Sequence, residues 1–148
     1  LNSASAKSYQ KVVIHDILEG VPVNRMMRDD PPTVSPDVSI EKLVHDHVMG
    51  SDDHAFPGFR EFRVGGIVTL DDIRSVNENE WQSTQARDIM TPINELSIVK
   101  TDSDASEAMT KLSARDVRLL PVIKNEELAG VLRRRDIIKW LHLESEAI

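Results

Sequence analysis

The chain carries one order of hydrophobic and polar patterns twice. Each half shows a short extended piece, apolar residues spaced as on one face of a helix, two apolar runs typical of strands, and a second amphipathic stretch. The order predicted for each half is therefore β-α-β-β-α. The first helices are predicted at 39–49 and 104–114, and the closing helices near Leu70 and Arg134. The predicted strands are 33–34, 56–59 and 63–68, then 97–99, 119–123 and 128–132.

Short residue motifs also recur at a nearly constant separation. Pro57 and Pro121 are 64 positions apart, as are the segments 66–68 and 130–132, which both begin with glycine. Asp72 and Asp136 follow these segments at the same separation. Two copies of about 60 residues would each bury little surface alone, so we expect them to share a core.

Three further segments complete the predicted organisation. Residues 8–18 carry a broad apolar stripe before Gly20, which predicts a helix with a glycine stop. Residues 76–85 are predicted to be a linker anchored by Trp81, and Asp104 is expected to start its helix in a capping box with Glu107. The predicted domains are a linker helix at 1–20, copy one at 21–80, and linker plus copy two at 81–148. The closing helix of copy two is expected to bury four residues: Ile137, Ile138, Trp140 and Leu141.

Composition and charge exclude several classes of function. The chain has 148 residues, 40% of them hydrophobic, and this content argues against disorder. Its net charge of -7 argues against binding to nucleic acid or anionic membranes. The absence of cysteine excludes disulfides, cysteine-ligated metals and a thiol nucleophile. No apolar stretch is long enough for a membrane span, and the start at Leu1 suggests a fragment of a longer protein.

The repeated motifs resemble a known family. Met27 and Met90 at the starts of the copies, the prolines of the first hairpin strands, and the glycine–x–x–threonine–x–x–aspartate segment at 66–72 resemble a tandem pair of cystathionine-β-synthase (CBS) domains, or Bateman module. The resemblance covers about residues 21–143. It implies an α/β (α+β) fold in which two pseudo-symmetric copies pack through their sheets, and it implies a homodimer.

The N-terminal region shows a narrower resemblance. The segments 8–10 and 18–23, with 66–74 and Trp81, are similar to the entry of CBS pairs at the C-terminus of site-2-protease-type membrane zinc metalloproteases. This similarity implies that the module regulates an attached hydrolase from the cytoplasmic side of a membrane. The chain itself contains no zinc-protease motif, so we expect it to be a regulatory fragment and not an enzyme.

The glycine–threonine–aspartate segment is the candidate ligand site. Gly66 would let a ligand approach the backbone, and the resemblance implies that the threonine approaches phosphate while the aspartate holds ribose hydroxyls. In this sequence the resemblance gives these roles to Thr69, Asp72 and Asp136. It implies AMP, ADP, ATP or S-adenosylmethionine as the ligand. The alternative is that Thr69 and Asp72 only cap a helix. The residues expected around an adenine slot are Met27, Val34, Pro57, Ile89, Ile98 and Pro121.

Copy two departs from the motif because Arg133 stands where threonine is usual. Three hypotheses follow. Arg133, or a neighbouring arginine, could bind phosphate. It could instead fill the ribose pocket or pair with an acidic residue such as Asp71. It could also belong to a solvated charge run formed by residues 133–135.

Two features suggest other chemistry weakly. His45, His47 and the acidic and histidine residues at 52–54 resemble a metal cluster, but helical and loop spacing separates them, so no metal site is predicted. Paired acidic residues without a nucleophile or partnered histidine predict no catalytic residue. The alternative to nucleotide sensing is a structural module for dimerisation or docking, which the altered motif of copy two and the Pro57-Gly58-Phe59 segment favour.

Overall fold

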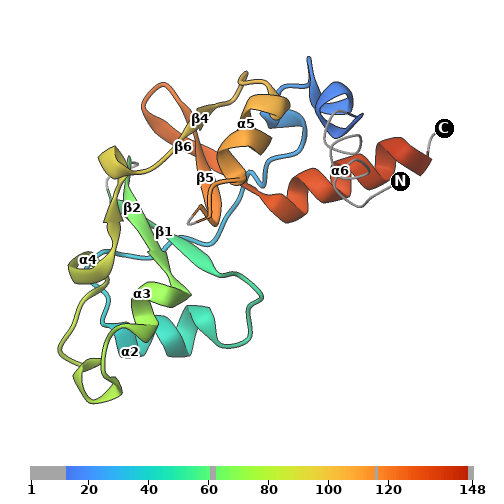
Figure 1. Cartoon of the computed structure of the whole chain (residues 1–148). Helices are drawn as coiled ribbons and strands as arrows, with labels where there is room; N and C mark the ends of the chain where they lie inside the picture. The colour runs from blue at the N-terminus through green and yellow to red at the C-terminus, as the bar shows by residue number, and fades with distance from the viewer. Residues whose placement is uncertain (1–12, 61–62, 116, 147–148) are drawn as a thin grey trace.

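The computed structural model describes residues 13–60, 63–115 and 117–146. Two three-stranded sheets form the two halves of the molecule (Figure 1). The first sheet contains β1 (Ala55–Arg60), β2 (Arg63–Thr69) and β3 (Thr91–Pro92). The second contains β4 (Val99–Lys100), β5 (Leu119–Lys124) and β6 (Glu127–Arg133). The predicted α/β architecture of two copies is confirmed.

Helices flank each sheet where amphipathic spacing predicts them, except α4, which the sequence pattern did not predict. The main helices are α2 (Ile40–Leu43), continued by the π-helix η2 (Val44–Val48), α3 (Leu70–Arg74), α4 (Ala86–Ile89), α5 (Ala105–Leu112) and α6 (Arg134–Glu146). Short 3-10 turns lie at η1 (Val23–Arg25), η3 (Glu78–Glu80) and η4 (Ile93–Glu95). Asp104 caps α5, but its carboxylate accepts from the amide of Ser106, so the capping box expected with Glu107 is wrong.

The strand pairings repeat between the two halves. Both hairpins contain six antiparallel residue pairs and one register shift, after Gly58 in the first and after Val122 in the second. A parallel pairing then lies at the same place in each half, from Val34 to Gly58 and from Val99 to Val122. The repeat in the sequence is therefore a repeat of structure, down to the position of the irregularity.

The segments that lead into each copy pair with the sheet of the other half. Arg28 exchanges backbone hydrogen bonds of 2.9 Å with Val131 in β6. At the equivalent place, Thr91 in β3 pairs with Ile67 in β2. Each sheet is thus completed by the entry segment of the opposite copy, which ties the two halves together.

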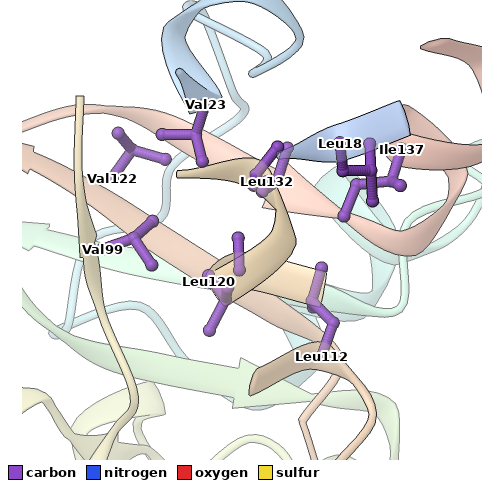
Figure 2. Close-up of a cluster of buried hydrophobic side chains, with 10 residues drawn as sticks. Leu18, Val23, Val99, Leu112, Leu120, Val122, Leu132 and Ile137 are labelled. Atoms are coloured by element: carbon purple, nitrogen blue, oxygen red, sulfur yellow. The ribbon is translucent and has the colours of Figure 1, made fainter. Parts of the chain in front are cut away.

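The apolar residues form a core in each half and a contact between the sheets. In the second half Leu18 and Val23 pack with α5, α6 and the sheet. Figure 2 shows them among side chains of these elements, such as Leu112, Leu132 and Ile137. In the first half Ala86 packs with α2, α3 and the sheet. The cluster that joins the sheets consists of Ala55, Ile67, Leu119 and Val131. This cluster confirms packing of the copies through their sheets.

Several local expectations can be compared with the structure. Gly20 has a φ of +83° and follows helical residues 13–18, as expected for a glycine stop, while the earlier part of the predicted helix lies outside the described residues. Trp81 anchors the linker through a 3.1 Å hydrogen bond to the carbonyl of Val76. Ile138 is 61% exposed, so its predicted burial is wrong, because consecutive helix residues point about 100° apart and Ile137 takes the buried direction on α6. No helix among the described residues is long and apolar enough to cross a membrane.

Candidate functional site

Two clefts lie between the halves at positions related by the repeat. We call the first the threonine cleft; its walls include Ile67, Thr69, Asp72, Leu96, Arg115 and Arg118, and its volume is about 630 Å³. We call the second the arginine cleft; its walls include Arg28, Asp53, Pro57, Val131, Arg133 and Arg135, and its volume is about 190 Å³. Ligand pockets usually measure about 300–1,000 Å³, a range that includes the threonine cleft. A hollow of about 510 Å³ shares Arg28, Asp53 and Arg133 with the arginine cleft.

Thr69 and Asp72 in the threonine cleft form a capping box at the start of α3. The amide of Asp72 donates to the Thr69 hydroxyl oxygen over 3.1 Å, and the amide of Thr69 donates to Asp72 Oδ2 over 2.9 Å. The helix-capping role is therefore present. It leaves Asp72 Oδ1 without a hydrogen-bond partner in the described part of the chain, and it leaves the Thr69 hydroxyl hydrogen available to donate.

Gly66 serves the fold and not a ligand. A Cβ atom at this position would collide with the backbone carbonyl oxygen of Thr91 and crowd the sulfur of Met90. Gly130 has the same relation to the carbonyl oxygen of Arg28. The expectation that Gly66 admits a ligand is therefore wrong, because the space beside it is filled by β3.

In copy two, Arg133 donates hydrogen bonds to both carboxylate oxygens of the motif's aspartate, Asp136. Its backbone amide and its Nε donate to Asp136 Oδ2 over 2.8 and 3.1 Å, and its Nη2 donates to Oδ1 over 2.8 Å. Both oxygens of the second aspartate are thus engaged, and the Arg133 and Asp136 side chains are only 19% and 8% exposed. The hydrogen bonds that Arg133 donates to Asp136 raise the pKa of Arg133 against the opposing effect of burial.

Asp53 joins this pair to the segment that leads into copy one. Its carboxylate accepts from Arg133 Nη1 over 3.0 Å and from Arg28 Nη1 over 3.2 Å. Burial acts to raise the pKa of Asp53, but hydrogen bonds from Ser51 and Arg28 and the charges of both arginines outweigh burial and lower it. A chain of alternating charges therefore runs from Arg28 through Asp53 and Arg133 to Asp136.

The hypotheses for the arginine run can now be compared with these contacts. Arg133 pairs with acidic residues, as one hypothesis held, but its partners are Asp136 and Asp53 and not Asp71. Asp71 instead lies 3.5 Å from Arg118. A solvated Arg133 is wrong for the same reason. Of its neighbours, Arg134 donates to the carbonyl of Leu112 over 2.8 Å, which satisfies the end of α5.

The structure does not gather the six apolar residues expected around adenine. Pro57 lines the arginine cleft, and Met27 lines a hollow of about 390 Å³ together with Arg133, Asp136 and Trp140. The remaining four lie in or beside the cores and strands, or at the surface: Val34, Ile89, Ile98 and Pro121. The walls that sequence reasoning missed include Arg115 and Arg118, on the loop before β5. The repeat could have identified this loop, because it lies about 64 positions after the loop before β1, which holds Asp53.

The histidine and aspartate residues considered as a metal cluster do not converge. His45 Nδ1 lies 2.9 Å from an oxygen of its neighbour Asp46, and Asp53 is engaged by arginines. Within the described ranges, no group of three or more potential ligands could hold a metal ion.

Comparisons with known proteins support the fold. Residues 86–143 match the family model of the CBS domain. Protein MJ1004 from Methanocaldococcus jannaschii matches with a TM-score of 0.74 and 21% identity over 83% of this chain, which spans 60% of MJ1004. A structure of CBSX2 in complex with AMP matches with a TM-score of 0.74 and 22% identity, over 85% of this chain and 99% of CBSX2.

A further structure, of the CBS domain NE2398, matches with a TM-score of 0.71 and 20% identity, over 82% of this chain and 97% of that one. At these identities the structures establish the fold, which is that of CBS-domain proteins. No curated protein sequence matches the chain.

Proposed function

We propose that the chain is a non-catalytic regulatory module that binds an adenine nucleotide in the threonine cleft. The observation that carries this proposal is Asp72, whose Oδ1 is free of partners among the described residues and lines a cleft of about 630 Å³ between the two copies. The fold shared with CBSX2, which was crystallised with AMP, supports the choice of ligand.

The walls of the threonine cleft offer the chemistry that a nucleotide needs. A free carboxylate oxygen accepts hydrogen bonds from a ribose diol, which assigns that contact to Asp72. Arg115 and Arg118, both exposed, supply positive charge for phosphate, and the Thr69 hydroxyl can donate to it. Apolar side chains on the same walls, such as Ile67 and Leu96, offer a surface for the adenine ring.

Regulation follows from the position of the cleft between two halves. A ligand shifts a conformational equilibrium only when it binds one arrangement more tightly than another. A nucleotide that bridges Asp72 in the first half and Arg118 in the second would favour one arrangement of the halves. An attached effector joined to the N-terminal segment would sense this change, because Leu18 and Val23 pack in the core of the second half.

The identity of the effector rests on sequence resemblance alone. The N-terminal segment resembles that of site-2-protease-type zinc metalloproteases, and on this basis the effector is a membrane protease with this module on its cytoplasmic side. We also propose that the module acts as a homodimer. Analytical ultracentrifugation of the purified chain would measure its mass in solution, and a single species at the monomer mass would contradict the dimer.

A second candidate, a structural module without ligand, is favoured by one observation. In copy two, both carboxylate oxygens of Asp136 accept hydrogen bonds from Arg133, so one of the two equivalent ligand positions is closed. A thermal-shift comparison separates the two candidates. A nucleotide at 100 times its dissociation constant stabilises the folded state by about 2.7 kcal/mol, and a structural module would show no shift.

Asp72→Ala tests the site directly. This variant removes the ribose contact and also one half of a capping box, a loss of about 1 kcal/mol. Asp88→Ala is a matched control, because Asp88 accepts from the amide of Gln85 in an equivalent capping box on α4 and lines neither cleft. Both variants should melt at lower temperature, but only Asp72→Ala should lose the shift with AMP, ADP, ATP or S-adenosylmethionine. An equal shift in both variants would place the ligand elsewhere.

A further inference from the structure

We propose that Arg133 is a built-in occupant of the second binding position, so that the chain binds one nucleotide and not two. This inference rests on the proposed function of the threonine cleft and adds its stoichiometry and the residue that determines it. The two positions are equivalent by the repeat: Thr69 and Asp72 in one, Arg133 and Asp136 in the other. The side chain at the threonine position therefore decides whether the aspartate is available.

The two aspartates differ in what they offer a ligand. Each accepts a hydrogen bond from the backbone amide three residues earlier, at 2.9 Å for Asp72 and 2.8 Å for Asp136. Asp72 then has one oxygen left. In Asp136 that oxygen accepts from Arg133 Nη2, and the capping oxygen accepts a second bond from Nε. A guanidinium group bound through two nitrogens to a carboxylate makes the contact that a ribose diol would otherwise make.

A second contact holds Arg133 in this position. Its Nη1 donates to Asp53 over 3.0 Å, and Asp53 is itself held by Arg28. A nucleotide entering the arginine cleft would have to break both sets of bonds.

The positive charge of the arginine cleft is also not left open for phosphate. Arg28 is paired with Asp53. Arg134 donates to the carbonyls of residues 112 and 114, and Arg135 donates to the carbonyl of Asp52. Four arginines on this wall, Arg28, Arg133, Arg134 and Arg135, thus each have a partner within the described chain, and Arg133 has two carboxylates. The geometry therefore favours a closed position over a phosphate site.

Isothermal titration with AMP tests the inference on the full chain. Arg133→Thr introduces at position 133 the residue type found at position 69. We expect it to raise the stoichiometry from one AMP per chain to two. Arg135→Thr is the matched control, because it removes a nearby arginine that donates a hydrogen bond to the backbone carbonyl of Asp52. It should still bind one AMP. In the double variant R133T/D136A the second binding event should disappear.

A variant that keeps Arg133 provides an independent test. Asp136→Asn in the otherwise unchanged chain should leave AMP affinity within about two-fold and stoichiometry at one, because Asp136 contacts no ligand. Loss of a binding event in Asp136→Asn would overturn the inference. Two AMP molecules bound by the unaltered chain, or a folded Arg133→Thr that gains none, would overturn it as well.

The outcomes also distinguish this inference from the proposed function. If the unaltered chain binds no AMP while Arg133→Thr binds one that depends on Asp136, the proposed threonine site is wrong and the role of Arg133 stands. If the unaltered chain binds one AMP that Asp72→Ala abolishes, and Arg133→Thr still binds only one, the proposed function stands and the role of Arg133 is wrong.

Discussion

At the residue scale, the two copies differ most at one position of the repeated motif. Threonine at position 69 caps a helix and leaves Asp72 half available, whereas arginine at 133 satisfies Asp136 with its own side chain. A cation at the start of a helix is unfavourable for the helix dipole, yet here a buried carboxylate in the first turn compensates for it. The substitution thus exchanges a ligand contact for an internal ion pair.

The ion pairs of Asp53 make stability depend on acid. The pKa of Asp53 is lower in the folded state than its ordinary value. A carboxyl group of this kind stabilises the fold above its unfolded pKa, and that contribution is lost as pH falls through the folded pKa. Urea unfolding at about pH 6 and about pH 3 should show a larger loss of stability in the unaltered chain than in Asp53→Asn. Equal losses in the two proteins would contradict this role.

At the element scale, short strands and helices are positioned by close backbone contacts more than by their own length. β3 has two residues, yet it is held against β2 because glycine at position 66 leaves room for Thr91. The same arrangement holds Arg28 against Gly130 in β6. These contacts place the wall residues of both clefts.

Gly66→Ala should therefore destabilise the fold. The added methyl group would meet the backbone of β3, and overpacking of this kind costs about 1–3 kcal/mol. Gly65→Ala is the neighbouring control, since its added Cβ would lie 3.8 Å from the carbonyl oxygen of Gly58, an ordinary contact distance. Chemical denaturation should show reduced stability in Gly66→Ala alone. Equal stability of the two variants would show that β3 does not need this glycine.

At the scale of the whole molecule, the two halves are interlocked. The second core includes Leu18 from before copy one and Val23 from its first residues, and the first core includes Ala86 from the start of the copy-two segment. The sheets also meet through the cluster that contains Ile67 and Val131. Neither half is complete without chain from the other, so the molecule should unfold as one cooperative unit.

A fragment of residues 86–148 tests this interlocking. It contains the segment that matches the CBS family model, but it lacks Leu18, Val23 and the strand pairing of Arg28. We expect the fragment to show no cooperative unfolding transition, and the full chain to show a single one by circular dichroism. A fragment that unfolds cooperatively, or two separate transitions in the full chain, would contradict the shared core.

Much of the fold could be predicted because it depends on local pattern. Apolar spacing and β-branched runs located both hairpins and the helices that begin at Ile40 and Ala105, and the repeated prolines and glycines revealed the duplication. The exchange of the entry segments could not be predicted in this way. It depends on which sheet edge is unfilled after folding, and no local pattern records that.

The candidate site was predictable only in part for the same reason. The motif residues Thr69 and Asp72 do lie in a cleft, because their spacing fixes them at one strand-to-helix turn. The expected adenine residues were chosen by apolar character, and most of these side chains pack into the cores or strands, where burial is more favourable. Asp136 is a near neighbour of Arg133 in the sequence, but its other partner, Asp53, lies 80 positions away and could not be identified from local sequence.

A crystal structure of the chain grown with AMP would show directly which cleft holds the nucleotide. We expect one nucleotide per chain, in the threonine cleft, with its ribose hydroxyls on Asp72 and its phosphate near Arg118. We also expect Arg133 to remain on Asp136. A nucleotide in the arginine cleft with Arg133 displaced would contradict nucleotide sensing by the threonine cleft alone, and an empty threonine cleft at saturating AMP would contradict binding there.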